Sequence, residues 1–217
     1  MALRGISVSF CNLLTWKYIH DNWHDNRVVY FDSISIYVAT RVLTRLNPSV
    51  LSGVEFVSRN RGLLSNSLTL SGSEYKTDGK NLVLPFWKDS VDVNKSDIEN
   101  LDNYIGDIVC IGISSPKQEV LADQLIGNYN TICFCLGAAL YNEVTGFARR
   151  NNLVWLALLY RDPRRGLNKI YQTLVEIFKL LFSKRRRREF KYFVAKAIQS
   201  HNEFIAVLSK FNIGRSN

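Results

Sequence analysis

The sequence predicts an α/β fold, with a Rossmann-like, mostly parallel sheet flanked by helices and a basic helical appendage at the C-terminus. Over the first 160 residues, short apolar runs rich in Val and Ile alternate with helical patterns. This alternation is typical of a parallel sheet that is covered on both faces. After Asp162-Pro163 only helical patterns follow. We therefore expect an α/β domain over residues 1–160 and a helical appendage over residues 161–217.

Four short, nearly continuous apolar runs are predicted to be buried strands: Arg27–Phe31, Asn81–Phe86, Asp107–Ile113 and Thr131–Leu136. Helical spacing follows the first run, from Ile34 to Arg45, and the third, from Val120 to Leu125. The polar stretch from Ser58 to Asp97 is predicted to be loops around one strand. Ligands of parallel sheets bind beyond the carboxyl ends of the strands, so the loops after these strands are where we expect functional residues.

Composition excludes several classes of protein. Hydrophobic residues make up 47% of the chain and charged residues 22%, which is unlike a disordered or collagen-like chain. The longest apolar stretches are about half of the ~20 residues that a membrane-spanning helix needs. Cys110, Cys133 and Cys135 lie in strand-like runs, so we expect buried free thiols and not a disulfide framework. With no export signal recognised at the N-terminus, a reducing cytoplasm is the expected compartment.

The excess positive charge is concentrated in the appendage. Residues 161–217 hold fourteen Lys and Arg against four Asp and Glu, a net charge of +10, whereas residues 1–160 are nearly neutral. Two apolar stripes at helical spacing flank the run Lys184–Arg188 (KRRRR). Such a pattern favours an appendage that faces an anionic membrane surface. A helical hairpin packed on the domain with a solvated basic turn is the alternative. A nucleic-acid partner is not expected, because the aromatic residues follow helical packing spacing.

The turn after the third predicted strand is the first candidate site. Ser115 can cap the following helix, Pro116 suits its first position, and Gln118 would complete a capping box. The helix N-terminus then lies at the carboxyl end of a buried strand, where free amide groups favour an anion. Lys117 adds a cation, while Gln118 and Glu119 can hydrogen-bond a ligand. We expect a phosphate-bearing ligand at this turn.

Two other strand ends carry weaker candidates. Asp32 ends the first predicted strand, where a carboxylate can act as a general base on a hydroxyl nucleophile or cap the helix that begins near Ser33. Gly137 and Ala138 follow the fourth strand, and residues this small allow either a close approach of the backbone to a ligand or simply a tight turn. The sequence alone leaves both pairs of alternatives open.

Metal binding is not expected. His20 and His24 are four residues apart, but no third ligand accompanies them, and Cys133-x-Cys135 is a strand alternation and not a zinc site. Arg164 and Arg165 begin the appendage. Clustered arginines suit bidentate phosphate recognition, although a solvated helix start is common for such a run.

Several segments, in the right order, resemble the WecG/TagA/CpsF glycosyltransferases. DIVCIGISSPKQEVLADQL resembles the family's strand and G-x-x-x-PKQE helix start, and CLGAALYNEVTG resembles the small-residue turn that follows. NNLVWLALLYRDPRRGLNKIY resembles a later segment with Trp, Leu-Tyr-Arg and Pro-Arg-Arg. Upstream, VVYFDSISIYVATRVL resembles the segment that contains the family's Asp-Gly pair.

The resemblance implies transfer of a hexose-type sugar from a UDP-sugar to a polyprenyl-diphosphate-linked acceptor. Such a reaction serves capsule, exopolysaccharide or teichoic acid assembly, and the enzyme would be peripheral on the cytoplasmic face of the plasma membrane. The family is inverting and needs no metal for its chemistry, so no cofactor is expected. A homo-oligomer or a partner glycosyltransferase is a further expectation from the resemblance.

The resemblance also implies residue roles. Asp32 matches the proposed general base, Gln118 matches a residue of the nucleotide-sugar site, and Asn12 matches an Asn of an early strand-end motif. Arg164 and Arg165 match arginines that hold diphosphate.

The chain departs from the family pattern at several places. Ser33 replaces the Gly after the aspartate, Val154 replaces a Glu, and no counterpart of the family's opening strand is recognised. An accessory subunit without catalytic activity on the same fold therefore stands as the alternative. A basic protein that binds a membrane surface or a nucleic acid through Lys184–Arg188 is the other.

Overall fold

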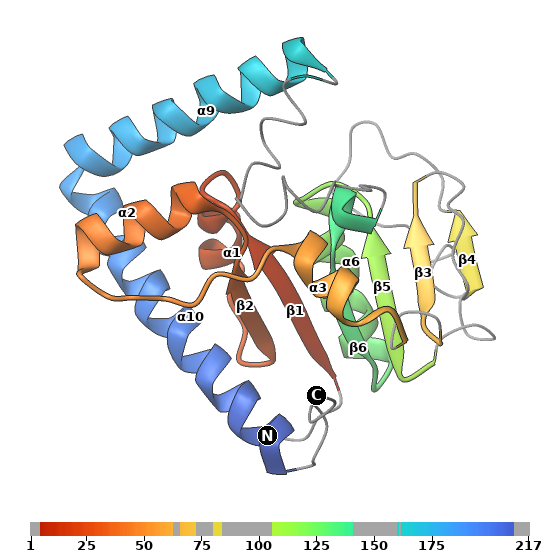
Figure 1. Cartoon of the computed structure of the whole chain (residues 1–217). Coiled ribbons are helices and arrows are strands. Elements are labelled where there is room, and N and C mark those ends of the chain that lie inside the picture. The colour runs from red at the N-terminus through yellow and green to blue at the C-terminus, as the bar shows by residue number, and fades with distance from the viewer. Residues whose placement is uncertain are drawn as a thin grey trace.

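The computed structural model describes residues 5–62, 66–72, 80–83, 106–140, 160 and 162–210 (Figure 1). Its centre is a six-stranded sheet in the order β2-β1-β6-β5-β3-β4, in which all neighbouring strands run parallel. The strands are β1 (Ile6–Cys11), β2 (Arg27–Phe31), β3 (Leu68–Ser71), β4 (Lys80–Val83), β5 (Ile108–Gly112) and β6 (Ile132–Cys135). The predicted parallel α/β sheet with flanking helices is thereby confirmed.

Two strands differ from the sequence-based expectation. β1 is fully buried between β2 and β6, although no strand was predicted there. Ser7 and Ser9 interrupt its apolar residues, yet both are buried, so the segment lacks the continuous apolar run that marks the other central strands. β3 is missed for the same reason, since Thr69 and Ser71 alternate with its leucines.

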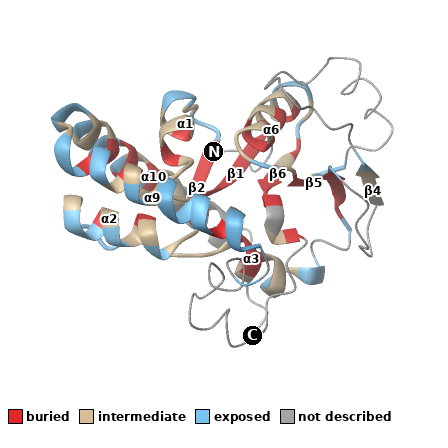
Figure 2. Cartoon of the chain, turned by 90° about the horizontal axis from the view of Figure 1, so that it is seen from above, coloured by how far each residue is buried: buried red, intermediate tan, exposed pale blue. Residues whose placement is uncertain are grey.

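Helices cover both faces of the sheet (Figure 2). On one face, α1 (Trp16–Asp21) and α6 (Lys117–Asn128) pack against β-strand side chains that include Val109, Ile111 and Cys133. On the other face, α3 (Gly53–Arg59) and the 3₁₀ turn η1 (Gly137–Leu140) pack on the alternate side chains of the same strands. The alternation of side chains along each strand places these two cores on opposite sides.

The C-terminal helix completes the core at one end of the sheet. Helix α10 (Lys184–Lys210) lies along β2, and its Phe190, Phe193, Val194 and Ala197 are buried together with Trp16 of α1. The second apolar stripe of the appendage therefore packs on the α/β domain. Burial of these side chains explains why the stripe is so regular in the sequence.

Helix α9 (Pro163–Phe182) is held mainly through its C-terminal half. The buried carboxylate of Glu176 accepts a hydrogen bond from Trp16 Nε1 at 3.1 Å and another from Arg186 Nε at 2.9 Å. The Arg186 guanidinium also lies 5.4 Å from the centre of the Trp16 ring, a favourable cation–π arrangement. The first apolar stripe of the appendage is different, because most of its side chains, such as Leu174 and Phe178, are exposed.

None of the described helices is both long enough and apolar enough to cross a lipid bilayer.

Candidate functional site

The candidate site lies at the edge of the sheet where the carboxyl ends of four neighbouring strands meet. Since β2, β1, β6 and β5 are adjacent and parallel, the loops that follow them come together at this edge. Asp32 follows β2, Asn12 follows β1, Gly137 follows β6, and Lys117 begins the helix after β5. Residues predicted from separate segments of the sequence therefore share one edge of the sheet.

The helices at this edge diverge between β1 and β2. The chain leaves β1 toward α1, on one face of the sheet. It leaves β2 through α2 (Ile34–Thr44), whose Ile36 is buried in the same cluster as Trp16 of α1, and then reaches α3 on the other face (Figures 1 and 2). Strand ends from which the chain leaves toward opposite faces are the usual ligand position in open parallel sheets. Asn12 and Asp32 are the residues at this position.

Asp32 is held by backbone groups on both of its sides. Its N–H donates to the Cys11 carbonyl at 2.8 Å, and its Oδ1 accepts from the Gly53 N–H, the first residue of α3, at 2.7 Å. Burial raises the pKa of Asp32 to about 7, against the opposing effects of the Gly53 hydrogen bond and the Lys169 ammonium group. A carboxyl group with a pKa near neutrality is suited to general base catalysis.

The structural role considered for Asp32, the N-cap of the helix that begins near Ser33, is wrong. The residue at the N-cap of α2 is Ser33, whose hydroxyl hydrogen-bonds that of Ser35 at 2.9 Å. Asp32 instead binds the start of α3, which is far along the chain. Gly53 also permits close packing of α3 on η1, because a Cβ atom there would lie 3.0 Å from the Cβ of Ala139.

Gln118 and Glu119 are buried at the start of α6. The Gln118 Nε2 donates to Glu119 Oε1 at 2.9 Å, and the Ser115 hydroxyl donates to Glu119 Oε2 at 2.6 Å. Burial raises the pKa of Glu119, although these hydrogen bonds oppose the shift. The Gln118 Oε1 atom is buried and has no hydrogen-bond partner among the described residues. A buried carbonyl oxygen of this kind can accept a hydrogen bond from a ligand N–H or O–H group.

The predicted capping box at this helix is wrong. Helix α6 begins at Lys117 with Pro116 at its N-cap, and no side chain caps it. The Ser115 hydroxyl binds Glu119 one turn later and not a backbone N–H. The polar side chains at this turn are thus organised around the Glu119 carboxylate.

The Asp32 carboxylate after β2 and the Glu119 carboxylate on α6 both influence Cys11, which lies at the end of β1. Burial raises the pKa of the Cys11 thiol at the end of β1, and the carboxylates of Glu119 and Asp32 raise it further. Both carboxylates therefore lie close enough to the end of β1 to act on one thiol. Asp32 and Gln118 belong to the same side of the molecule.

The other predicted site residues are placed as follows. The Asn12 Oδ1 accepts from the Leu14 N–H at 2.8 Å, so this side chain also shapes the turn after β1. Lys117 is partly exposed at the start of α6. Arg164 is exposed in the first turn of α9. The side chains of Ala138 and Arg165 lie outside the described residues.

Lys169 is a candidate that the sequence analysis missed. It lies on α9, and its positive charge lowers the pKa of Asp32, so α9 brings a cation to the strand-end edge. Lys169 follows Arg165 by four residues, which places the two on one face of a helix. Helical periodicity applied to the appendage could have found it.

His20, His24 and the four cysteines make contacts that stabilise the fold. The His24 ring bonds Asp123, which also pairs with the buried Arg27, and His20 packs edge-on against Phe193. Among the described residues, no group of three or more potential metal ligands is found. The four cysteines are buried and free, which confirms the prediction for Cys110, Cys133 and Cys135.

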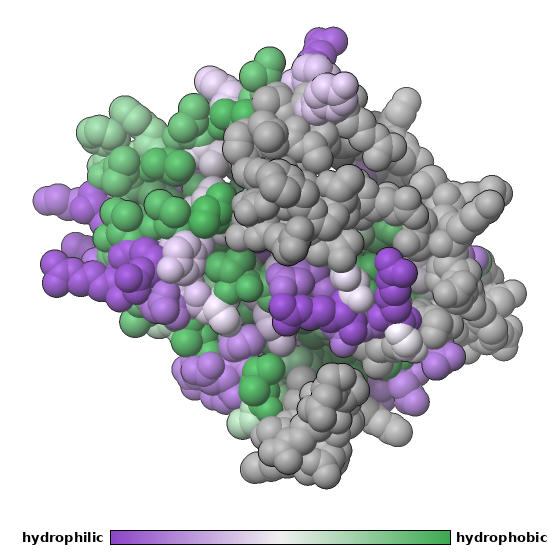
Figure 3. Space-filling view, viewed as in Figure 1, coloured by the Kyte–Doolittle hydropathy of each residue, from purple (hydrophilic) through white to green (hydrophobic). Residues whose placement is uncertain are grey.

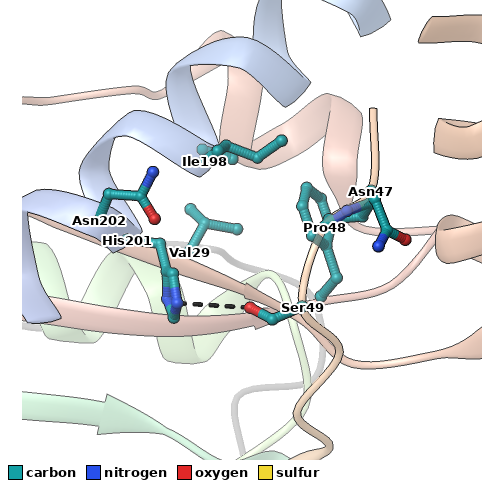
Figure 4. Close-up of a pocket in the computed structure, with 9 residues that line it drawn as sticks. Val29, Asn47, Pro48, Ser49, Ile198, His201 and Asn202 are labelled. Atoms are coloured by element: carbon teal, nitrogen blue, oxygen red, sulfur yellow. Dashed lines mark hydrogen bonds between the residues drawn. The ribbon is translucent and has the colours of Figure 1, made fainter. Parts of the chain in front are cut away.

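A separate cavity of about 270 Å³ lies between β2, the connection from α2 to α3, and α10 (Figure 4). His201 and Ser49 face each other across it, with Nε2 and Oγ 3.4 Å apart. Burial lowers the pKa of His201. None of the predicted site residues lines this cavity, so it is distinct from the strand-end site.

Gly137 offers a test of the geometry around Gln118. Its φ is +53°, and an added Cβ would lie 3.2 Å from Gln118 Oε1. We expect Gly137→Ala to lower the free energy of unfolding by about 1–2 kcal/mol, because an L-residue is strained in the left-handed region. The variant should also displace the Gln118 amide. Denaturant unfolding measures the first effect.

The matched control for this variant is Gly127→Ala. Gly127 lies in α6 with open space around its Cα, so alanine should stabilise the helix by about 0.5–1 kcal/mol. Equal effects of the two variants would contradict the arrangement of Gly137 against Gln118.

In comparisons with known proteins, no protein-family model matches the chain, and no curated protein matches it in sequence.

Proposed function

We propose that the protein is an inverting glycosyltransferase that moves a hexose-type sugar from a UDP-sugar to a polyprenyl-diphosphate-linked acceptor. The observation that carries this proposal is the gathering of Asp32, Gln118 and Glu119 at the carboxyl ends of adjacent parallel strands. The resemblance of the surrounding segments to the WecG/TagA/CpsF glycosyltransferases supports the same reaction class.

In this proposal Asp32 is the general base. It takes the proton from an acceptor hydroxyl, whose oxygen forms a bond to the anomeric carbon of the donor sugar. The bond from that carbon to the UDP oxygen breaks, and UDP leaves with the electron pair. A pKa of about 7 supports this role, since a base with a pKa near the working pH is partly ionised yet still accepts a proton readily.

The start of α6 is the proposed donor site. The Gln118 Oε1, which has no hydrogen-bond partner in the described part of the chain, can accept a hydrogen bond from the uracil ring or a sugar hydroxyl. The positive charge of Lys117 and the positive end of the α6 dipole favour the negative charge of the leaving diphosphate. No metal ion or other cofactor is part of the proposed reaction.

The acceptor diphosphate is proposed to bind at the start of α9. Arg164, Arg165 and Lys169 lie in its first two turns, and Lys169 acts on Asp32. The exposed apolar stripe of α9 and the basic run Lys184–Arg188 support docking of the appendage on an anionic membrane surface. Each basic residue near such a surface contributes about 1 kcal/mol. The proposed location is peripheral, on the cytoplasmic face of the plasma membrane.

The donor prediction can be tested by thermal unfolding of the purified chain with a series of UDP-sugars. A donor present at a hundred times its dissociation constant should stabilise the folded state by about 2.7 kcal/mol. UMP and UDP separate recognition of the nucleotide from recognition of the sugar. The Gln118→Ala variant should lose most of the shift, because it removes the buried amide.

GDP- and ADP-sugars are the negative controls for this screen. Stabilisation by none of the UDP-sugars, or by all nucleotides equally, would contradict a uridine site at α6. Transfer of radiolabelled sugar to a polyprenyl-diphosphate acceptor by the purified chain then separates an enzyme from an accessory subunit.

A further inference from the structure

Helix α2 exposes an aliphatic stripe that does not pack against the core of its own domain. Ile34, Val38 and Val42 are spaced by four residues and are 48%, 50% and 67% exposed. The opposite side of the helix is buried through Ile36 and Thr40. Residues four apart share one face of a helix, so α2 has one side in the core and a second apolar side in water.

This stripe lies beside the exposed stripe of α9. Figure 3 shows hydrophobic side chains gathered over α2 and α9 on one side of the molecule. Both helices pack against α10, so the same neighbour positions them. We name this surface the α2–α9 face, and its exposed apolar members are Ile34, Val38, Val42, Leu167, Ile170, Tyr171, Leu174, Phe178, Leu181 and Phe182. A contiguous apolar surface of this kind indicates an interaction site.

The charges on α2 and α9 indicate which kind of partner this apolar surface binds. Helix α2 contains no Asp or Glu, and its Arg41 is exposed, as is Arg45 just after it. The only acidic residue of α9 is Glu176, which is buried and paired with Arg186. Arg185, at the turn into α10, is 90% exposed. Two copies of this face would bring like charges together, whereas an anionic lipid surface complements both the cations and the apolar stripe.

We propose that α2 is a second lipid-binding element, and that the whole α2–α9 face rests on an anionic bilayer. The proposed function assigns membrane contact to the appendage alone; here the α/β domain contributes directly. Val38 and Val42 enter the boundary between headgroups and acyl chains, while Arg41 and Arg45 meet lipid phosphates.

The consequence for the acceptor rests on the proposed function. Helix α2 begins two residues after Asp32, and α9 carries Lys169, whose charge acts on Asp32. A bilayer against both helices therefore lies close to the strand-end site. An acceptor hydroxyl attached to a membrane lipid through a diphosphate reaches Asp32 while its hydrocarbon chain stays in the bilayer.

The test is binding of the full-length protein to phosphatidylcholine vesicles with and without phosphatidylglycerol, measured by flotation. The Val38→Asp/Val42→Asp variant should lose about tenfold or more in partition to the anionic vesicles, since each apolar side chain leaves and a like charge arrives. Val38→Gln/Val42→Gln should lose less, and Phe178→Asp on α9 should lose a comparable amount. Val83→Asp is the matched control, because Val83 is 45% exposed on β4, at the far end of the sheet.

Circular dichroism and thermal stabilisation by the UDP-sugar donor show whether each variant is folded. Folded α2 variants that bind anionic vesicles like the wild type overturn the role of α2 and leave the proposed reaction intact. A wild-type chain that ignores vesicles but forms a dimer, which the α2 variants dissociate in sedimentation, assigns the face to a second copy and overturns the proposal. Loss of vesicle binding by the α2 variants and by Phe178→Asp, with Val83→Asp unaffected, supports it whatever the reaction proves to be.

Discussion

Replacement of Asp32 by asparagine is expected to lower the rate of sugar transfer by about 10²- to 10⁴-fold, the usual contribution of a general base. The fold should survive, because the Oδ1 of asparagine can still accept the hydrogen bond from the Gly53 N–H. Donor binding should be nearly unchanged, since the proposed donor site is at α6. Initial rates with saturating donor and acceptor measure the effect.

The same substitution at Asp25 is the control. Asp25 precedes β2 as Asp32 follows it, and its side chain is exposed. Asp25→Asn should retain full activity. A folded Asp32→Asn variant with wild-type rates would remove Asp32 from the role of base.

Asp32 also makes both activity and stability depend on pH. Its pKa is about 7 in the folded state and near the ordinary value of 3.8 in the unfolded chain. Between these values the folded state keeps a proton that the unfolded state has lost, so the free energy of unfolding falls as the pH rises from about 4 to 7. The transfer rate should rise over the upper part of this range as the base ionises. Asp32→Asn should remove this rise in rate and lessen the fall in stability, part of which remains because burial also raises the pKa of Glu119.

Replacement of Phe193 by alanine is expected to lower the free energy of unfolding by about 3–5 kcal/mol. Phe193 is fully buried and touches the rings of Trp16 and Phe31. The loss should be this large because Phe193 is part of the core that α10 forms beside β2, and removal of its ring leaves a cavity there. Urea unfolding followed by Trp fluorescence and by circular dichroism measures the effect.

The neighbouring Tyr192 provides the control, since its side chain is 62% exposed. Tyr192→Ala should change the free energy of unfolding by less than about 1 kcal/mol. A small effect of Phe193→Ala as well would mean that α10 is a detachable appendage and not part of the core.

The local sequence patterns were sufficient for the fold class and for much of the site. Strands such as Arg27–Phe31 are continuous in apolar character because both faces are covered, and that burial is visible in the residues themselves. The order of elements then places Asp32 and Gln118 at strand ends, and parallel strands bring those ends to one edge. Strand β1 escaped detection because buried serines break the pattern.

Periodicity could not distinguish the two stripes of the appendage. An apolar stripe has the same spacing whether it packs on a sheet or lies open to another partner. In the structure, the stripe with Phe190 and Phe193 is buried, whereas the stripe with Leu174 and Phe178 is exposed. That difference depends on which surface each helix meets.

The residue types and their spacing thus established an α/β chain with a basic helical end and a carboxylate directly after the strand Arg27–Phe31, because burial and helical pitch leave local marks in a sequence. The contact of Asp32 with Gly53 and the approach of Lys169 became visible in the folded chain alone. The same holds for the Gln118 oxygen, which lacks a partner among the residues that the structure describes, and for the joining of α2 with α9 in one face. Each of these features joins segments that are distant along the chain. Their separation in space is set by long-range packing, which leaves no local pattern in the sequence.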